Sequence, residues 1–335
     1  MIQNIKIKKN NISKPSLQNN SRRVIAILGQ TATGKSDLAI KLAKKYNGEI
    51  VNADSRAFYK HMTIGTAKPK KDKKIPEKYS WIKKFKNNGP YVSKDVVHWI
   101  IDFETMDNPM NAGMYKNMAD SVINQIFSRG KIPIVVGGSG LYASIILDGF
   151  SIPKVEPDEA LRKKLEKMSV KNLALKFKKL DPKSSEKIDL KNKRRLIRAY
   201  EITFKTGKSF IEQTQKIKPN YKVLKIGIEN NKQNILENIT KRTGEMIKDG
   251  LIEEVKKIRK YGLDKTQVFN STIGYPQILQ YIKGETSLDE ATEEIELRIR
   301  QFAKRQKTWF KKEKDIKWIK TQKEAEKLVN KFLKS

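Results

Sequence analysis

The sequence predicts an α/β fold in which helices flank a parallel sheet and an all-helical segment interrupts it. A short apolar run, residues 23–28, is followed by a glycine-rich loop and then by apolar residues at helical spacing. Similar short runs occur at 49–53 and 132–136. A lysine-rich stretch with helical periodicity separates them from another strand-like run, 222–228. Short apolar runs that alternate with helical segments are typical of buried parallel strands.

Polar residues follow these runs at the points where the strands should end. The glycine-rich loop of residues 29–36 follows the first run and leads into a helix expected at 36–46. Asp54 follows the second run, and the turn of residues 137–140 follows the third. Ligands of parallel sheets bind at the carboxyl ends of the strands, so we expect these three segments to converge.

The composition changes along the chain in a way that predicts its domains. Residues 1–20 contain lysines and no acidic residue, and we interpret them as a disordered basic tail. Residues 154–220 show no strand pattern and predict an inserted helical domain. Residues 21–153 and 221–335 then form the catalytic core, the latter part being mainly helical after its first strand.

The net charge of +34, from 71 basic and 37 acidic residues, favours a polyanionic partner such as nucleic acid. The alternative is that lysine is abundant for reasons of codon usage and the charge has no binding role. The chain has no cysteine, which excludes disulfides, zinc fingers and thiol nucleophiles. No apolar run approaches the length of a membrane span, so we expect no membrane association and a cytoplasmic protein. We assume a monomer.

The loop Gly29-Gln30-Thr31-Ala32-Thr33-Gly34-Lys35-Ser36 has the spacing of a phosphate-binding loop. Its backbone N–H groups and the following helix N-terminus attract phosphate oxygens, Lys35 adds a positive charge, and the Ser36 hydroxyl is a candidate Mg²⁺ ligand. The sequence therefore predicts a P-loop NTPase-like core. A hydrolase of this class needs a carboxylate at a second strand end. Asp54 is a candidate for that role or for a base, so the loop alone leaves the reaction open.

Further segments carry a resemblance to a known family. Residues 52–69 read NADSRAFYKHMTIGTAKP, residues 137–142 read GGSGLY, and residues 300–309 read RQFAKRQKTW. Together with the phosphate loop, they resemble the tRNA dimethylallyltransferases of bacterial type, also called tRNA isopentenyltransferases. The resemblance extends from about Val24 to about Trp318, and the IGTAKP and RQxAKRQxTW blocks are its most specific parts.

The resemblance implies a prenyltransferase. Such an enzyme moves a dimethylallyl group from dimethylallyl diphosphate to N6 of the adenine that is 3′-adjacent to the anticodon (position 37). The acceptors are tRNAs that read codons starting with U, and the products are N6-isopentenyladenosine and diphosphate. The phosphate loop, residues 29–36, would hold the diphosphate of the donor with Mg²⁺. The partner would be the anticodon stem-loop of tRNA.

The resemblance also assigns roles to individual residues. Asp54 matches the general base that contacts the adenine amine, although an aspartate before Ser55 can also cap a turn. Thr31 and Ser139 match hydroxyls that hold the donor and orient the acceptor, and Arg242 matches an arginine that reaches the diphosphate. We therefore expect these catalytic residues: Lys35, Thr31, Asp54, Ser139 and Arg242.

The expected tRNA contacts lie in the core and in the inserted domain. The target base must be turned out of the anticodon loop, and the inserted domain would grip the stem. A solvated basic face is the alternative interpretation of its arginines. Two residues of the last long helix, Phe302 and Trp309, are expected to pack in the core. The residues expected to contact tRNA are Asp54, Ser55, Arg56, Ala57, Ser139, Arg162, Arg194, Arg195, Leu196, Ile197 and Arg198.

The chain departs from the family pattern at several positions. Gln30 stands where proline is common, Gly140 stands where a larger residue is common, and Met110-Asn111 replaces a Tyr-Ser pair. His98 is the single histidine of a block that often has two. These departures lead us to expect a donor pocket of different shape.

Other functions remain open from the sequence. A small-molecule kinase or ATPase would share the phosphate loop, but it would leave the IGTAKP block unexplained. Transfer of the same group to free adenosine phosphates would not need the basic insertion. A non-enzymatic nucleic-acid-binding protein with an inert loop is a further alternative.

Overall fold

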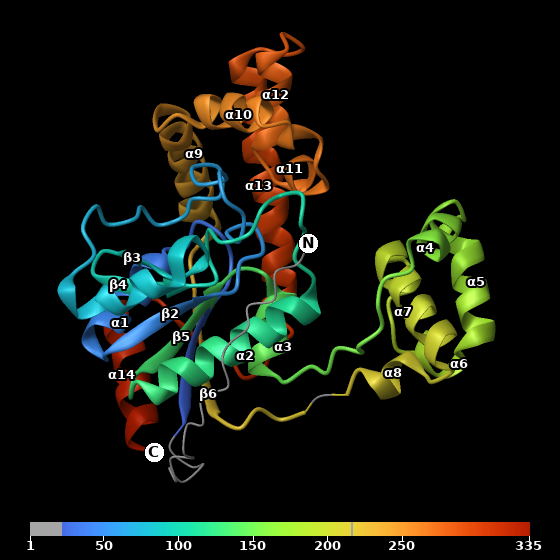
Figure 1. The fold of residues 1–335 in the computed structure, drawn as a ribbon, viewed down its shortest axis with the longest axis horizontal. Helices are drawn as coiled ribbons and strands as arrows, with labels where there is room; N and C mark the ends of the chain where they lie inside the picture. The colour runs from blue at the N-terminus through green and yellow to red at the C-terminus, as the bar shows by residue number, and fades with distance from the viewer. Residues whose placement is uncertain (1–21, 216) are drawn as a thin grey trace.

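The computed structural model describes residues 22–215 and 217–335, so the predicted basic tail, residues 1–20, lies outside the described residues. A seven-stranded sheet with the order β3-β4-β2-β5-β1-β6-β7 forms its centre (Figure 1). Neighbouring strands pair in parallel except β3 and β4, which form an antiparallel hairpin at one edge. The predicted α/β fold is confirmed. The strands are Arg23–Leu28 (β1), Gly48–Asn52 (β2), Tyr91–Ser93 (β3), Val96–Trp99 (β4), Ile132–Gly137 (β5), Lys222–Ile228 (β6) and Lys317–Ile319 (β7).

Helices cover both faces of the sheet because successive side chains of a strand point to opposite sides. In β1, Ile25 and Ile27 join the smaller core on the side of α1 and α14. Val24, Ala26 and Leu28 join the larger core, which also contains residues of α2 and α3. Outside the insertion, the helices are α1 (Lys35–Lys45), the 3₁₀ segment η2 (Glu77–Asn88), α2 (Ala112–Ser128), α3 (Gly140–Leu147), α9 (Lys232–Lys248), α10 (Leu251–Lys260), η3 (Leu263–Lys265), α11 (Gln267–Ser271), α12 (Tyr275–Ile282), α13 (Leu288–Phe310) and α14 (Gln322–Lys334).

In the described residues between α3 and β6, every regular element is a helix. These helices enclose a separate apolar core that contains Leu165, Leu173, Phe177 and Leu196. Figure 1 shows this helical domain standing apart from the sheet, joined to it by one length of chain before α4 and another after α8. Its helices are α4 (Glu159–Glu166), α5 (Val170–Leu180), α6 (Pro182–Ser185), α7 (Lys193–Thr206) and α8 (Phe210–Gln213).

The sequence pattern missed the edge strands β3, β4 and β7. The hairpin turn of β3 and β4 is Lys94-Asp95, and both residues have positive φ (50° and 61°). Two-residue hairpin turns with this backbone usually contain glycine or asparagine, so lysine and aspartate give little local signal. Strands of three or four residues are also too short to show a periodicity.

The last long helix, α13, does not bury the side chains that we expected. Its buried stripe contains Ala291, Ile295, Ala303, Gln306 and Phe310. Trp309 lies beside that stripe and is 42% exposed, so the prediction that it packs in the core is wrong. Phe302 is half-buried. Trp309 lines a cavity that also borders the helical domain, and therefore the indole ring stays accessible.

The described part of the chain contains no helix that is both long and apolar enough to span a membrane.

His98 makes the stability of this fold sensitive to mild acid. The residue is 3% exposed, and its ring stacks on Tyr91 with a centroid distance of 5.7 Å. Burial lowers the pKa of His98 to about 4, although Asp72 and the Ser93 backbone oppose this shift. An unfolded chain would protonate this histidine near pH 6.5, so the stability falls as the pH drops from about 6.5 to about 4. The loss reaches about 3 kcal/mol at most, since one pKa unit is about 1.4 kcal/mol.

We therefore expect His98→Gln to flatten this part of the stability profile, as measured by urea denaturation between pH 7 and pH 4. His61, the other histidine of the chain, is exposed; partial burial and Lys257 lower its pKa too, but not as far, so His61→Gln is the control and should flatten the profile less than His98→Gln. Parallel profiles for His98→Gln and the unchanged protein would contradict the prediction.

Candidate active site

The phosphate loop joins β1 to α1 and contacts the C-terminal part of the chain. Within the loop, the Thr33 hydroxyl donates to the Gln30 carbonyl at 2.9 Å, and Lys35 Nζ donates to the same carbonyl. Lys35 thus folds back over the loop. The Gln30 side-chain amide donates to the Ala303 carbonyl of α13 at 3.0 Å. The glutamine that departs from the family pattern therefore attaches the loop to α13.

Charged side chains from three distant segments meet beside this loop. Burial lowers the pKa of Lys35 to about 7, the Asp54 carboxylate opposes this shift, and Arg242 adds to it. Burial also lowers the pKa of Arg242, again opposed by Asp54. Arg242 Nη1 donates to Thr31 Oγ1 at 3.1 Å. Two cations and one carboxylate leave a local excess of positive charge, which suits a bound diphosphate.

Arg242 comes from the middle of α9, which begins at Lys232. Although the helix faces solvent on one side, this side chain is only partly exposed, and it lies against the loop.

Asp54 and Ser139 stand at the ends of adjacent strands, as we expected. Asp54 lies two residues after the end of β2, and its Oδ1 accepts a hydrogen bond from the Arg56 backbone at 3.0 Å. Ser139 is the N-cap residue of α3, and its Oγ accepts a hydrogen bond from the Ser55 backbone at 3.3 Å. The phosphate loop, Asp54 and the turn after β5 therefore converge at one edge of the sheet.

Gln306 on α13 connects two of these segments, and we did not single it out in the sequence. Its side chain is buried, its Oε1 accepts from the Thr31 backbone at 2.7 Å, and its Nε2 donates to the Gly138 carbonyl at 2.9 Å. The RQxAKRQxTW block contained a signal for this role. A glutamine on the buried face of an amphipathic helix is expected to have polar partners.

Small residues in the turn after β5 let α13 approach it closely. A Cβ atom on Gly138 would lie 2.1 Å from Gln306 Nε2, and one on Gly140 would lie 2.3 Å from Trp309 Nε1. The glycine at 140 is thus matched to the tryptophan at 309, since a larger residue would displace the indole ring.

The arginines of the helical domain fall into two groups. Arg162 forms two hydrogen bonds to the buried Glu201 at 2.9 and 2.8 Å, and Arg198 pairs with the same carboxylate. Arg194 and Arg195 are exposed on α7. One buried carboxylate therefore holds the first group in place, and the second group is available to a partner.

Three of the residues expected to contact tRNA have buried side chains. Leu196 and Ile197 are 0% and 6% exposed within the core of the helical domain, and Ala57 is 6% exposed in a small apolar cluster with Tyr91 and Ile101. Their apolar side chains pack in these cores, and the prediction that these residues contact tRNA stays a prediction.

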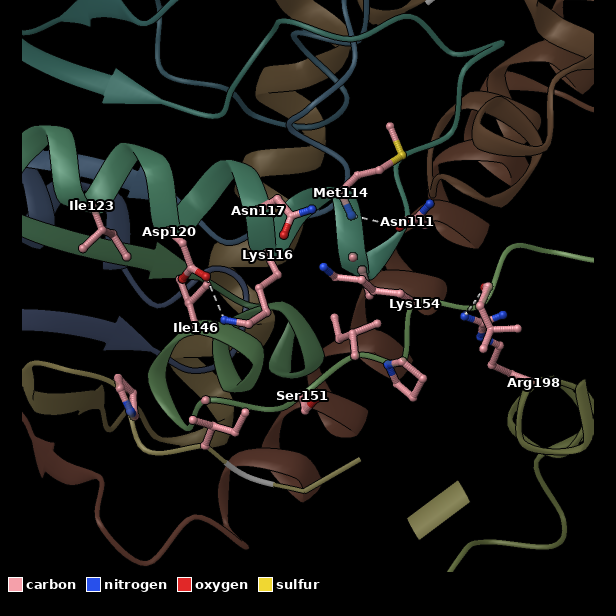
Figure 2. A pocket seen from close by; sticks show the side chains of 18 of the residues that line it. Asn111, Met114, Lys116, Asn117, Asp120, Ile123, Ile146, Ser151, Lys154 and Arg198 are labelled. Atoms are coloured by element: carbon pink, nitrogen blue, oxygen red, sulfur yellow. Dashed lines mark hydrogen bonds and ion pairs between the residues drawn. The ribbon is translucent and has the colours of Figure 1, made fainter. Parts of the chain in front are cut away.

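Two cavities lie between the helical domain and the core. One of about 910 Å³ lies between α2 and the two linkers, and its lining includes Lys154, Arg162 and Arg198 (Figure 2). The other, about 630 Å³, is lined by Arg195 on α7 and by Arg305 and Trp309 on α13. Both cavities are bordered by basic side chains from both units.

The IGTAKP block has a structural function that the sequence did not reveal. The Glu254 carboxylate on α10 accepts hydrogen bonds from the backbone N–H groups of Thr63, Ile64 and Gly65 at 2.9 to 3.2 Å. The Tyr275 hydroxyl donates to the same carboxylate at 2.7 Å. A Cβ atom on Gly65 would lie 2.7 Å from the Tyr275 ring, which explains the glycine. The block thus attaches the loop after β2 to the C-terminal helices.

Glu254→Gln is expected to destabilise the fold by about 3 kcal/mol, because an amide cannot accept all these hydrogen bonds and has no charge. The midpoint of urea denaturation measures this change. The matched control is Glu253→Gln, whose exposed ion pair with Lys256 should contribute less than about 1 kcal/mol. Equal midpoints for the two variants would contradict the assigned role of Glu254.

Comparisons with known proteins agree with this geometry. The family model described as IPP transferase matches residues 57–313, and the one described as isopentenyl transferase matches residues 22–88. The chain is 38% identical over 303 residues to the tRNA dimethylallyltransferase of Acetivibrio thermocellus, covering 88% of this chain and 91% of that protein. It is 37% identical over 301 residues to the tRNA dimethylallyltransferase of Dehalococcoides mccartyi, covering 88% and 87%.

Solved structures show the same similarity. The tRNA isopentenylpyrophosphate transferase of Bacillus halodurans superposes with a TM-score of 0.65 at 29% identity, covering 94% of this chain and 97% of that one. A eukaryotic dimethylallyltransferase acting on tRNA superposes with a TM-score of 0.71 at 26% identity, covering 90% and 74%. With these matches over most of its length, and with the phosphate loop, Asp54 and Arg242 assembled at one edge of the sheet, the chain belongs to the tRNA dimethylallyltransferase family.

Proposed function

We propose that the protein transfers a dimethylallyl group from dimethylallyl diphosphate to N6 of the adenine at position 37 of tRNAs that read codons starting with U. The products are N6-isopentenyladenosine and diphosphate. The observation that carries this proposal is the cluster of Lys35, Arg242 and Asp54 beside the phosphate loop. It combines two cations for a leaving diphosphate with one carboxylate for a proton.

The loop and its cations stabilise the leaving group. The backbone N–H groups of the loop, Lys35 and Arg242 would surround the diphosphate oxygens, where negative charge grows as the C–O bond breaks. Thr31 Oγ1, which now accepts from Arg242, would help to place the diphosphate. These groups are positioned before the reaction, so little reorganisation is needed when the charge develops.

Asp54 removes the proton from the acceptor. As adenine N6 forms a bond to the allylic carbon, the electron pair of the C–O bond leaves with the diphosphate. N6 then carries an extra proton, which Asp54 accepts. The neighbouring Ser139 hydroxyl, already at hydrogen-bond distance from the Ser55 backbone, would help to orient the adenine.

The residues of the loop are compatible with Mg²⁺. The Ser36 hydroxyl is exposed in the first turn of α1 and is a hard oxygen donor, which Mg²⁺ prefers. In the described part of the chain, no group of three or more His, Cys, Asp or Glu side chains is placed to hold a metal. We propose that Ser36 is the protein ligand and that diphosphate oxygens complete the shell. When bound, the ion would neutralise charge on the leaving group.

We further propose that tRNA binds between the core and the helical domain, with the anticodon stem-loop against α7. The net charge of +34, the exposed Arg194 and Arg195 and the two basic cavities support this location. Arg162 and Arg198 would contact the tRNA with the guanidinium N–H groups that do not bond to Glu201. We propose a monomer acting in the cytoplasm.

Arg194→Ala combined with Arg195→Ala is expected to weaken tRNA binding and to flatten its salt dependence. Each lost phosphate contact should reduce the log–log slope by about 0.7 to 0.9. Filter binding at several salt concentrations measures the slope. Lys41→Ala with Lys44→Ala, on the exposed face of α1, provides a control with the same charge change. Equal slopes for the two double variants would contradict the proposed location.

The reaction itself is tested with dimethylallyl diphosphate and unmodified tRNA. Mass spectrometry of the digested tRNA should show a prenylated adenosine at position 37, together with stoichiometric diphosphate. Parallel reactions contain ATP without donor, or adenosine monophosphate in place of tRNA. Turnover of either alternative with no prenylated tRNA would reject the proposal in favour of a kinase, an ATPase or a free-nucleotide prenyltransferase.

A further inference from the structure

Asn52, the last residue of β2, uses its side chain to hold the backbone of Asp54. Its Oδ1 accepts a hydrogen bond from the Asp54 N–H at 3.1 Å, and its Nδ2 donates to the Asp54 carbonyl at 3.0 Å. One carboxamide thus satisfies both backbone polar groups of the proposed base. The Asn52 side chain is buried, with the residue 8% exposed, so these bonds are shielded from competing water.

The same carboxamide is attached to a neighbouring segment. Asn52 Nδ2 also donates to the Ile100 carbonyl at 2.9 Å, just after β4. Ile100 has a positive φ of 58°, which is uncommon for a β-branched residue and indicates a backbone held by its surroundings. Asn52 therefore connects Asp54 to a constrained backbone segment at the carboxyl end of β4.

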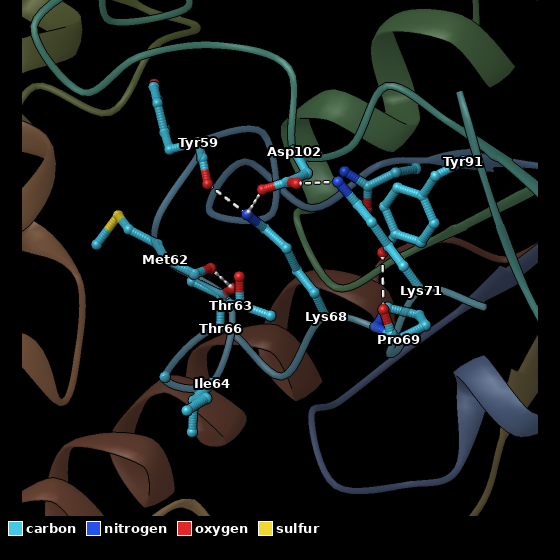
Figure 3. Close-up of polar contacts among 12 residues, drawn as sticks. Tyr59, Met62, Thr63, Ile64, Thr66, Lys68, Pro69, Lys71, Tyr91 and Asp102 are labelled. Atoms are coloured by element: carbon cyan, nitrogen blue, oxygen red, sulfur yellow. Dashed lines mark hydrogen bonds and ion pairs between the residues drawn. The ribbon is translucent and has the colours of Figure 1, made fainter. Parts of the chain in front are cut away.

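A second set of bonds fixes the chain that follows Asp54. The Asp102 N–H donates to the Ala57 carbonyl and the Phe103 N–H donates to the Phe58 carbonyl, both at 2.9 Å. Lys68, whose side chain is 1% exposed, pairs with Asp102 at 2.9 Å and donates to the Tyr59 carbonyl (Figure 3). The loop is thus anchored beyond Asp54, and Asn52 is the side chain that sets the orientation of Asp54 itself.

We propose that Asn52 is a positioning residue for Asp54, which rests on the proposed role of Asp54 as the base. Asp54 Oδ1 is occupied by the Arg56 N–H, and the described residues form no other hydrogen bond to this carboxylate. The remaining oxygen, Oδ2, is therefore open to the adenine amine. Rotation of the Asp54 peptide would move that oxygen away from its place beside Lys35. The carboxamide of Asn52 opposes this rotation at both ends of the residue, and the Ala57 N–H, which also donates to the Asp54 carbonyl at 3.2 Å, restrains one end only.

Asn52→Ala is expected to lower kcat on the order of 10²-fold, because an error of about 1 Å in a reacting group has such an effect. The KM for dimethylallyl diphosphate and the Kd for tRNA should change by less than about twofold, since Asn52 contacts neither. The kcat of Asn52→Ser should lie between those of Asn52→Ala and the unchanged protein, because a hydroxyl can still accept from the Asp54 N–H. Ser93→Ala, which removes a buried side-chain bond to the Lys70 carbonyl elsewhere in the sheet, is the control for general loss of packing.

A double-mutant cycle decides whether Asn52 acts through Asp54. Once Asp54→Asn has removed the base, adding Asn52→Ala should reduce kcat by less than about twofold further, because residues that act as a unit are not additive. An equal loss in both backgrounds, or an unchanged kcat in Asn52→Ala, overturns the inference. If Asn52→Ala does not fold, the same cycle with Asn52→Ser applies the same criteria. Full activity of Asp54→Asn alone would instead reject the role of Asp54 on which the inference rests.

Discussion

Asp54→Asn is expected to reduce kcat by about 10²- to 10⁴-fold, the usual contribution of a positioned general base. The amide keeps an oxygen that can accept from the Arg56 N–H, so the loop should retain its conformation. It cannot take a proton from adenine N6. Single-turnover kinetics with saturating donor and tRNA measure the change, because they isolate the chemical step from product release.

Binding should be largely retained in this variant. The Kd for tRNA should stay within about threefold, since phosphate contacts supply most of the affinity. Asp107→Asn removes an exposed carboxylate elsewhere in the core and should leave kcat unchanged. A single-turnover rate for Asp54→Asn within a few-fold of the unchanged protein would exclude Asp54 as the base.

Lys35→Met is expected to lower kcat/KM for dimethylallyl diphosphate by about 10²- to 10³-fold, the usual effect of removing a group that stabilises developing charge. The side chain of methionine has a similar length and no charge. Steady-state kinetics at fixed tRNA measure the loss. Lys35→Arg keeps a charge in an altered shape and should recover part of it. A loss of tRNA binding without a loss of donor binding would contradict the assignment of Lys35 to the diphosphate.

The lowered pKa of Lys35 adds a pH dependence to donor binding. In the free protein, Lys35 loses its proton as the pH rises through about 7. A bound diphosphate favours the charged form, so binding takes up a proton above this pH. The affinity should therefore fall as the pH rises from about 7, approaching tenfold per pH unit.

Calorimetry of diphosphate binding in buffers of different ionisation enthalpy measures this proton uptake. In Lys35→Met, the only proton uptake that remains should come from titration of the diphosphate itself. Identical proton uptake by both proteins would show that Lys35 stays charged in the free state.

The interior of the sheet and the phosphate loop were predictable from the sequence because their signals are local. The run of residues 23–28 predicts a buried strand from six adjacent residues, and the loop needs only a fixed spacing of glycines, Lys35 and Ser36. The convergence of Asp54 with the turn after β5 follows from a general property of parallel sheets. The activity could be predicted only from the resemblance to a family, because a phosphate loop alone is compatible with several reactions.

Other parts of the site could not be predicted from local patterns. Gln306 bonds to Thr31 across 275 positions of sequence, and Glu254 bonds to Ile64 across 190. Arg242 looks like an ordinary helix-surface arginine until the fold brings α9 against the loop. The exposure of Trp309 and the pairing of Arg162 with Glu201 depend in the same way on how helices pack.

The sequence by itself determined the inner strands of the sheet (β2, β5, β1 and β6), the phosphate-binding loop and the position of its proposed base after β2, since these depend on residues that are close in the chain. Only the tertiary structure decided which side chains hold that base and that loop in place. Asn52, Gln306 and Glu254 act through hydrogen bonds to backbone groups, and a backbone group has the same chemistry at every position. The position of a backbone group in the folded chain, and not the residue type that carries it, therefore decides which side chain bonds to it.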